Sequence, residues 1–251
     1  MPVLGVIPAR LGSTRLARKP LQLLGGEPLI VRVLERVRQV PVFGAVVVAT
    51  DAPEVAAVVE RVGGRVVMTS SLHESGTDRV AEVARSAGFT GFDVIVNVQG
   101  DEPFLPEEAI RGAIDRVVGG DDVGTAAVPL DPGLAGEPSR VKVVTDRRGR
   151  ALYFSRAPIP HRRDPAETGE GLYWQHLGVY AYSRPALGEW VAAPPTVLER
   201  AERLEQLRAL ELGLSIGVAH LARPAPPGID TAEDLERAER LWTATALEDS
   251  R

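Results

Sequence analysis

Three basic side chains lie close together in the loop that follows the first predicted strand. The strand covers residues 3–7, and Arg10, Ser13, Arg15 and Lys19 follow it. Free backbone N–H groups beside small residues, together with flanking cations, can bind a polyanion such as a nucleoside triphosphate. The stretch has neither the G-x-x-x-x-G-K-[ST] phosphate loop nor the dinucleotide fingerprint. A solvated basic loop is therefore the alternative interpretation.

Two aspartates are candidate ligands for a divalent cation. Asp101 follows a strand predicted over residues 93–98, within Gln-Gly-Asp-Glu-Pro, and Asp230 precedes the last predicted helix. Carboxylate oxygens suit Mg²⁺, which keeps water and phosphate oxygens as its other ligands. The alternatives are a turn role for Asp101 and, for Asp230, a contribution to the helix cap beside Thr231. Glu102 is a weaker candidate, because neighbouring side chains need not point the same way.

Other polar residues fall in three further segments. Residues 73–79 combine Ser75, a glycine and a helix start, which predicts either an anion or base contact or a plain helix cap. Arg156 is able to bind a carboxylate with two parallel hydrogen bonds, although a surface ion pair is the alternative. Glu199 and Gln206 lie on a charged helix, most of which we expect to be a solvated face.

Strand and helix patterns alternate along the first half of the chain. We expect strands over residues 3–7, 45–49, 65–68, 93–98 and 125–128, and helices over 28–37, 54–62, 77–87 and 106–118. This succession predicts an α/β fold with a mostly parallel sheet flanked by helices. In such sheets ligands lie beyond the carboxyl ends of the strands, where the basic loop, Thr50-Asp51 and Gln99-Gly100-Asp101 all fall.

The pattern changes after residue 128. Segments 141–145 and 151–154 flank a turn and predict a hairpin, and a third extended segment covers 176–182. We expect an antiparallel excursion over about 130–182 that covers the site or pairs subunits. Helices over 184–191 and 196–212, a strand over 215–219 and a last helix capped by Thr231 complete the expectation.

Composition excludes several classes of function. The 251 residues carry a net charge of −5, which argues against general nucleic-acid binding, and they include no cysteine. The chain has no long apolar segment and begins directly with a predicted strand, so we expect a cytoplasmic protein that does not enter a membrane. It lacks G-x-S-x-G and H-E-x-x-H, so hydrolysis by a serine nucleophile and zinc catalysis have little support.

Eight motifs in fixed order resemble one known family. They are Ile-Pro-Ala-Arg-x-x-Ser-Thr-Arg-Leu-x-x-Lys-Pro-Leu, His-x-Ser-Gly-Thr-Asp-Arg, Val-Asn-Val-Gln-Gly-Asp-Glu-Pro, Val-Lys-Val-Val, Ala-Leu-Tyr-Phe-Ser-Arg, His-Leu-Gly-Val-Tyr, Leu-Glu-Gln-Leu-Arg and Gly-Ile-Asp-Thr-x-Glu-Asp-Leu. The set is similar to the 3-deoxy-manno-octulosonate cytidylyltransferases, or CMP-Kdo synthetases, over residues 3–241. Single motifs are shared with wider nucleotidyltransferases, whereas the ordered set is specific.

The resemblance implies that CTP and the sugar acid Kdo give CMP-Kdo and pyrophosphate with Mg²⁺, for lipopolysaccharide synthesis. It implies one Rossmann-like domain of the nucleotide-diphospho-sugar transferase type over residues 1–251, a homodimer and no nucleic-acid partner. Catalytic roles fall to Arg15, Lys19, Asp101 and Asp230, and the two aspartates would bind the metal. Nucleotide contacts fall to Ala9, Arg10, Ser13, Arg15, Lys19, Ser75, Gln99 and Gly100. Sugar contacts fall to Gln99, Arg156, His176, Glu199 and Gln206.

Two positions depart from the family pattern. Many relatives carry Pro-Gly where this chain has Ala17-Arg18, and loss of that glycine removes freedom at positive φ. Gln175 replaces a residue that is often basic. The alternatives to the Kdo reaction are a nucleotidyltransferase for a related sugar acid (8-amino-Kdo or a sialic-type acid) and a non-catalytic nucleotide-binding subunit.

Overall fold

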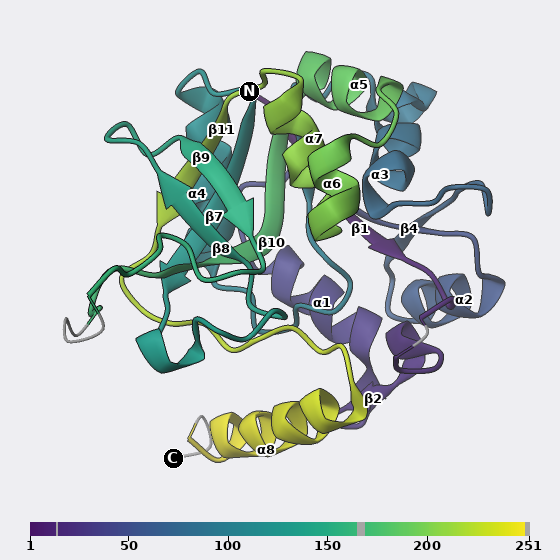
Figure 1. Ribbon diagram of the computed structural model, residues 1–251. Coiled ribbons are helices and arrows are strands. Elements are labelled where there is room, and N and C mark those ends of the chain that lie inside the picture. The colour runs from purple at the N-terminus through teal and green to yellow at the C-terminus, as the bar shows by residue number, and fades with distance from the viewer. Residues whose placement is uncertain (14, 165–168, 249–251) are drawn as a thin grey trace. The chain divides into compact units, whose positions relative to one another are not determined.

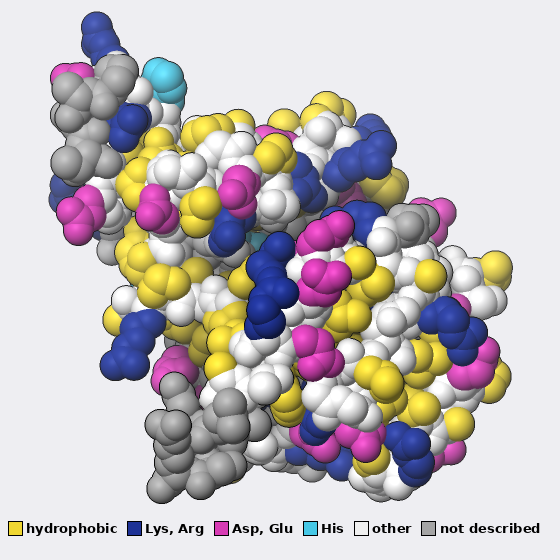
Figure 2. All heavy atoms as spheres, turned by 90° about the horizontal axis from the view of Figure 1, so that it is seen from below, with side chains coloured by type: hydrophobic (Ala, Val, Ile, Leu, Met, Phe, Trp, Pro, Cys, Tyr) yellow, Lys and Arg dark blue, Asp and Glu magenta, His cyan; other side chains and the backbone are white. Residues whose placement is uncertain are grey.

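The structure, a computed structural model, describes residues 1–13, 15–164 and 169–248 (Figure 1). The chain forms two compact units, which are described separately. Unit 1 comprises Met1–Phe92, Asn97–Leu105 and Pro226–Arg251, and unit 2 comprises Asp93–Val96 and Pro106–Ala225. Within the described residues, no helix has both the length and the apolar character needed to cross a membrane. Figure 2 shows basic and acidic side chains interspersed on the face that it draws.

Unit 1 is built on three parallel strands. β1 (Val3–Ala9) pairs with β4 (Ala45–Thr50), which pairs in turn with β5 (Arg65–Met68). The β-branched residues of β4 favour a strand. Val47 and Val48, which are adjacent in β4 and point to opposite faces, are both fully buried, as expected where a strand is covered on both faces. The carboxyl ends of these strands therefore lie along one edge, as the alternating pattern predicted.

Helices cover this parallel sheet. The helices of unit 1 are α1 (Leu29–Arg38), α2 (Pro53–Arg61), α3 (Gly76–Arg85) and α8 (Ala232–Glu248), with 3-10 turns η1 (Lys19–Leu21) and η2 (Ala87–Phe89). α1 buries Ile30, Val33, Leu34 and Val37, an apolar stripe at helical spacing. A short hairpin of β2 (Leu23–Leu24) and β3 (Glu27–Pro28), absent from the sequence prediction, lies beside α8 (Figure 1).

Unit 2 combines parallel and antiparallel pairs. β7 (Val123–Pro129) pairs in parallel with β11 (Ile216–His220) and antiparallel with β10 (Trp174–Ser183). β8 (Lys142–Thr145) pairs with β10 and forms the predicted hairpin with β9 (Ala151–Ser155). β6 (Val94–Asn97) crosses the boundary between the units. The α/β class with helices flanking mostly parallel strands is confirmed.

The helices of unit 2 contain one correction. They are α4 (Glu107–Val118), α5 (Arg184–Ala192), α6 (Val197–Glu202) and α7 (Gln206–Glu211), with the 3-10 turn η3 (Pro132–Leu134). The prediction of one helix over residues 196–212 is wrong. Arg203 adopts a left-handed conformation with φ of 51°, which ends α6 before α7 begins. The segment therefore forms two short helices, α6 and α7, which contact each other.

Candidate active site

The basic loop after β1 is shaped by a left-handed residue and a proline. Arg18 has φ 52° and ψ 35° and stands at the N-cap of η1, which carries Lys19. Pro20 follows Lys19 in the first turn of η1, where its fixed φ suits a helical start and no N–H is needed for a hydrogen bond within the turn. The positive φ that the family's glycine would supply is thus adopted here by an arginine, and the turn still forms.

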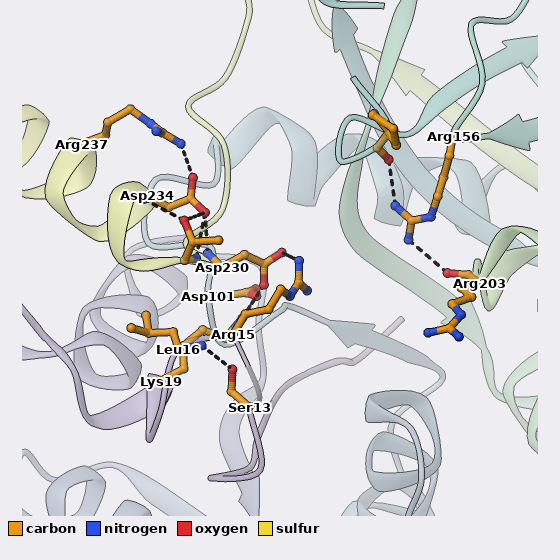
Figure 3. Close-up of polar contacts among 12 residues, drawn as sticks. Ser13, Arg15, Leu16, Lys19, Asp101, Arg156, Arg203, Asp230, Asp234 and Arg237 are labelled. Atoms are coloured by element: carbon orange, nitrogen blue, oxygen red, sulfur yellow. Dashed lines mark hydrogen bonds and ion pairs between the residues drawn. The ribbon is translucent and has the colours of Figure 1, made fainter. Parts of the chain in front are cut away.

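Lys19 lies between the two aspartates that were predicted to bind a metal. Its Nζ donates to Oδ2 of Asp101 at 2.5 Å and to Oδ1 of Asp230 at 2.9 Å. Arg15 Nη1 lies 3.1 Å from Oδ2 of Asp230. Figure 3 shows these four side chains pointing toward one another. Burial lowers the pKa of Lys19, but the two carboxylates outweigh burial and raise it above 10.5, so the ammonium stays charged.

The cap of α8 leaves the Asp230 carboxylate available. Asp234 N donates to Thr231 Oγ1 at 3.2 Å, and Asp234 Oδ2 accepts from the backbone N–H groups of Thr231 at 2.9 Å and Asp230 at 3.1 Å. The predicted capping box is confirmed, and Thr231 and Asp234 form it. Asp230 contributes its N–H to the cap while its side chain turns toward Lys19, so the two alternatives given for Asp230 are compatible.

Close backbone approach brings Asp101 to the same place. Ile229 N donates to Asp101 O at 2.9 Å, which ties the segment before α8 to the loop after β6. Val98 N donates to Val6 O at 3.0 Å, so this loop also runs beside β1. A Cβ at Gly100 would lie 2.9 Å from Pro8 O, closer than packing allows. Glycine is therefore required where these two backbones meet.

Glu102 is influenced by the same pair of carboxylates. Burial, followed by repulsion from Asp101 and Asp230, raises its pKa to about 8, against a smaller opposing effect of Lys19. Its Oε1 lies where a Cβ at Gly228 would approach to 3.0 Å. A pKa of about 8 favours the protonated form of Glu102 near pH 7.

Arg10 contacts the segment that carries Ser75. Arg10 Nη1 donates to Glu74 O at 3.4 Å, next to Ser75. Ser75 Oγ accepts from Asp78 N at 3.1 Å and donates to Asp78 Oδ2 at 2.9 Å, so Ser75 forms the cap of α3. Ser13 Oγ accepts from Leu16 N at 3.4 Å within the basic loop. The helix-cap role of Ser75 is thus present, and its nucleotide contact stays a prediction.

A buried arginine of α3, Arg79, ties the start of this helix to the segments that end β4 and follow β5. Arg79 is 2% exposed, and its Nη1 donates to Thr69 Oγ1 at 2.6 Å and to Ser70 O at 3.3 Å. Its Nη2 lies 3.4 Å from Asp51 Oδ2 at the end of β4. The sequence analysis included Arg79 only as the last residue of the 73–79 motif and assigned it no supporting role.

In unit 2, Arg156 is bonded to backbone carbonyls. Its guanidinium donates to Glu202 O at 2.8 Å and Pro138 O at 2.9 Å, and it donates to Arg203 O at 3.2 Å, a bond that Figure 3 shows. The Arg156 N–H donates to the Glu202 carboxylate at 3.0 Å. A cation at these carbonyls stabilises the C-terminal end of α6. The neighbouring Lys142 is fully buried and donates to the carbonyls of Glu137, Arg140 and Arg156.

Three further residues predicted to contact a sugar, His176, Glu199 and Gln206, lie in unit 2, whereas Gln99 lies in unit 1. Glu199 accepts from Arg208 at 2.6 and 2.8 Å, and Gln206 is 4% exposed at the start of α7. His176 lies 2.9 Å from Thr125 Oγ1. Within the described residues, no hydrogen bond or ion pair joins Arg156, His176, Glu199 and Gln206 to one another. Their sugar contacts stay predictions.

The donor set of unit 1 fits a hard divalent cation. Mg²⁺ is bound in proteins through one or two carboxylates plus substrate phosphates, and Asp101 and Asp230 converge on one point, the Lys19 ammonium. Among the described residues no group of three or more His, Asp or Glu side chains could hold a metal by itself. A cation here would therefore need phosphate or water oxygens to complete its coordination.

Comparisons with known proteins agree with this geometry. The sequence model of the family described as cytidylyltransferase matches residues 4–216. A 3-deoxy-manno-octulosonate cytidylyltransferase of Gemmatimonas aurantiaca is 56% identical over 96% of this chain and 95% of its own length. The enzyme of that name from Polynucleobacter necessarius is 47% identical over 94% of each chain. A solved structure of a CMP:2-keto-3-deoxy-manno-octonic acid synthetase complexed with CTP is 40% identical, with a TM-score of 0.90 over 98% of this chain and 100% of the other.

These similarities extend over nearly the full length of both partners in each comparison, and they include the segments that carry Arg15, Lys19, Asp101 and Asp230. Sequence reasoning gave Lys142 and Asp234 no part in the site, although both stand in the ordered motifs, and it did not single out Thr125. The family resemblance drawn from the ordered motifs is confirmed. The chain belongs to the cytidylyltransferases and, within them, to the 3-deoxy-manno-octulosonate cytidylyltransferases.

Proposed function

We propose that this chain transfers the cytidylyl group of CTP to Kdo, giving CMP-Kdo and pyrophosphate and activating the sugar for lipopolysaccharide synthesis. The single observation that carries the proposal is the cluster of Arg15 and Lys19 with Asp101 and Asp230. Two cations that suit a triphosphate and two carboxylates that suit a divalent cation meet beyond the end of β1. The relatives named for this reaction match nearly the whole chain.

The reaction depends on positioning and charge neutralisation. The anomeric hydroxyl of the sugar attacks the α-phosphorus, and pyrophosphate leaves on the opposite side. Arg15 and Lys19 stabilise the charge that develops on the leaving pyrophosphate. Lys19 suits this role because its pKa is raised and its ammonium stays charged throughout. Arg15, whose side chain is 64% exposed, has room to turn toward a phosphate chain.

Asp101 and Asp230 would hold Mg²⁺ in this site. When bound, Mg²⁺ neutralises phosphate charge and makes a hydroxyl that it touches more acidic. The chain's own part is to present two carboxylates from fixed backbones, through the Ile229–Asp101 bond and the α8 cap. Ala9, Arg10, Ser13, Ser75, Gln99 and Gly100 would surround the nucleotide, and Gln99, Arg156, His176, Glu199 and Gln206 would contact the sugar acid.

Pyrophosphate release from purified protein tests the proposal. With Mg²⁺, CTP and Kdo, we expect turnover that needs all three, with little activity when ATP or UTP replaces CTP. Competition between Kdo, 8-amino-Kdo and a sialic acid identifies the preferred sugar. Asp101→Asn should lower kcat at least 100-fold and keep the unfolding midpoint near that of the wild type. Absence of pyrophosphate release by the wild type would refute the proposal.

We also propose that the chain acts as a homodimer in the cytoplasm, where CTP is available. Unit 2 exposes apolar side chains on β9 and α6: Leu152 is 62% exposed and Val197 68%. A contiguous exposed apolar patch is typical of a surface that meets a partner, and we propose that these side chains belong to such a patch. Analytical ultracentrifugation should give twice the chain mass. Leu152→Glu should weaken the dimer, while Val118→Glu, at the exposed end of α4, should not. A monomeric wild type would refute the assembly.

A further inference from the structure

A buried threonine lies opposite an irregularity in β10. The antiparallel register between β7 and β10 shifts between Leu177 and Tyr180, which places extra backbone opposite Thr125. Thr125 is fully buried, and its Oγ1 lies 2.7 Å from Val179 O and 3.2 Å from Leu177 O. Bulges of this kind re-aim neighbouring side chains. His176 directly precedes the shifted segment, and its Nε2 is 2.9 Å from the same hydroxyl.

The proton count at this hydroxyl fixes the histidine tautomer. A threonine hydroxyl has one proton, and the carbonyls of Leu177 and Val179 are acceptors only. The proton of Thr125 therefore goes to a carbonyl, and Oγ1 accepts from His176 Nε2–H. In a neutral ring this leaves Nδ1 as the unprotonated nitrogen, which is an acceptor.

Packing and burial keep the ring in this state. Phe154 meets the imidazole edge to face with ring centres 5.1 Å apart, and the Tyr180 ring is tilted against it with ring centres 5.3 Å apart. Burial lowers the pKa of His176 to about 3, so the ring is neutral near pH 7. A neutral imidazole cannot form an ion pair with a carboxylate group of the ligand.

We propose that Thr125 is a positioning residue that holds His176 as the neutral Nε2–H tautomer, so that Nδ1 accepts a hydrogen bond from a hydroxyl group of the sugar acid. This deepens the proposed function and rests on it for the identity of the ligand. The acidic group of the sugar is then bound by other residues. Specificity at His176 is for a hydroxyl donor at one position of the sugar.

Nitrogen NMR of the nucleotide-free protein tests the tautomer without any substrate. With ¹⁵N-labelled histidine at pH 7, and His176 assigned by loss of its signals in His176→Gln, we expect a protonated Nε2 and an unprotonated Nδ1. Thr125→Ser keeps the hydroxyl and should keep this pattern. Thr125→Val keeps the volume, loses the acceptor and should shift His176 toward the Nδ1–H tautomer. A protonated Nδ1 in the wild type, or an unchanged pattern in Thr125→Val, would overturn the proposal.

Steady-state kinetics test the consequence for the sugar. Thr125→Val should raise the KM for Kdo about 10-fold, the size of one lost hydrogen bond, and leave the KM for CTP within 2-fold. Thr125→Ser should restore the KM for Kdo. Equal changes in both KM values, or no rescue by serine, would show a merely structural role. Failure of the wild type to release pyrophosphate would reject the Kdo reaction, whereas the NMR result decides the tautomer independently.

Discussion

Replacing Lys19 with methionine should make the nucleotide-free protein bind divalent cations more tightly. In the wild type, a cation that binds Asp101 and Asp230 must first displace the ammonium, which donates to both at 2.5 and 2.9 Å. Met is similar in length and carries no charge, so Lys19→Met removes this competition. The variant also leaves two carboxylates facing each other, which a divalent cation neutralises.

The size of the effect follows from the exposure of the three side chains. Lys19 and Asp101 are 16% and 24% exposed and Asp230 is 41% exposed. Exposed ion pairs contribute below about 1 kcal/mol, and loss of one partner from a fully buried pair costs about 3–5 kcal/mol. We assign about 1.5 kcal/mol to the Asp101 pair and about 0.5 kcal/mol to the Asp230 pair on these scales. A total near 2 kcal/mol corresponds to roughly 30-fold in Kd.

Isothermal titration of Mg²⁺ or Mn²⁺ into nucleotide-free protein measures this difference directly. Arg15→Met is the matched control, because Arg15 also pairs with Asp230 but is 64% exposed. We expect the control to change the metal Kd less than about 5-fold. Lys19→Met should also lose about 2 kcal/mol of unfolding free energy and regain it when Mg²⁺ is added. Equal metal affinity in Lys19→Met and the wild type would refute this reasoning.

Three further predictions concern the loop, the close approach and the buried histidine. Arg18→Gly should raise the unfolding free energy by about 1 kcal/mol relative to Arg18→Ala in urea titrations, because glycine adopts a φ of 52° without strain; equal stability of the two variants would contradict this. Gly100→Ala should cost about 2 kcal/mol, since its Cβ would lie 2.9 Å from Pro8 O, while Gly12→Ala, with nothing within 4 Å, should cost little. The pKa of His176 is lowered to about 3, so the unfolded chain takes up a proton between pH 3 and 6.5 and stability falls as pH falls through 6.5. Between pH 7 and pH 5 the wild type should therefore lose about 2 kcal/mol more than His176→Gln, and equal losses would place the folded pKa near its ordinary value.

Local patterns predicted most elements because they are strong over short windows. The strand predicted over residues 65–68 is β5 as observed, since Gly63-Gly64 ends the preceding helix and apolar residues follow. The prediction of one helix over 196–212 is wrong because no local pattern marks the break in it. Arg203 adopts a left-handed φ although no glycine or proline marks the position in the sequence. Its carbonyl accepts from the guanidinium of Arg156, which follows β9 and is far away in the sequence.

The sequence could predict those site residues that follow the carboxyl ends of parallel strands. Asp101 was placed at the site because carboxyl ends of parallel strands share one edge. Asp230 precedes a helix, and the sequence could not decide between a cap and a ligand. In the structure its N–H takes part in the cap and its carboxylate pairs with Lys19, and its role as a metal ligand stays a prediction. Thr125 gave no signal at all, because its importance comes from a register shift in a partner strand about 50 residues later.

The pairing of Lys19 and Arg15 with the two aspartates explains how so charged a site is stable before any substrate binds. Two cations and two carboxylates satisfy one another, so neither set is left without a partner in the folded chain. A triphosphate offers the cations new partners, and a divalent cation offers the carboxylates theirs. A triphosphate alone would leave the two carboxylates without partners, and a divalent cation alone would leave the two basic side chains without partners, whereas both ligands together pair all four groups. CTP and Mg²⁺ should therefore bind with positive cooperativity, a reciprocal coupling that Lys19→Met would weaken by removing the contact that joins the two halves.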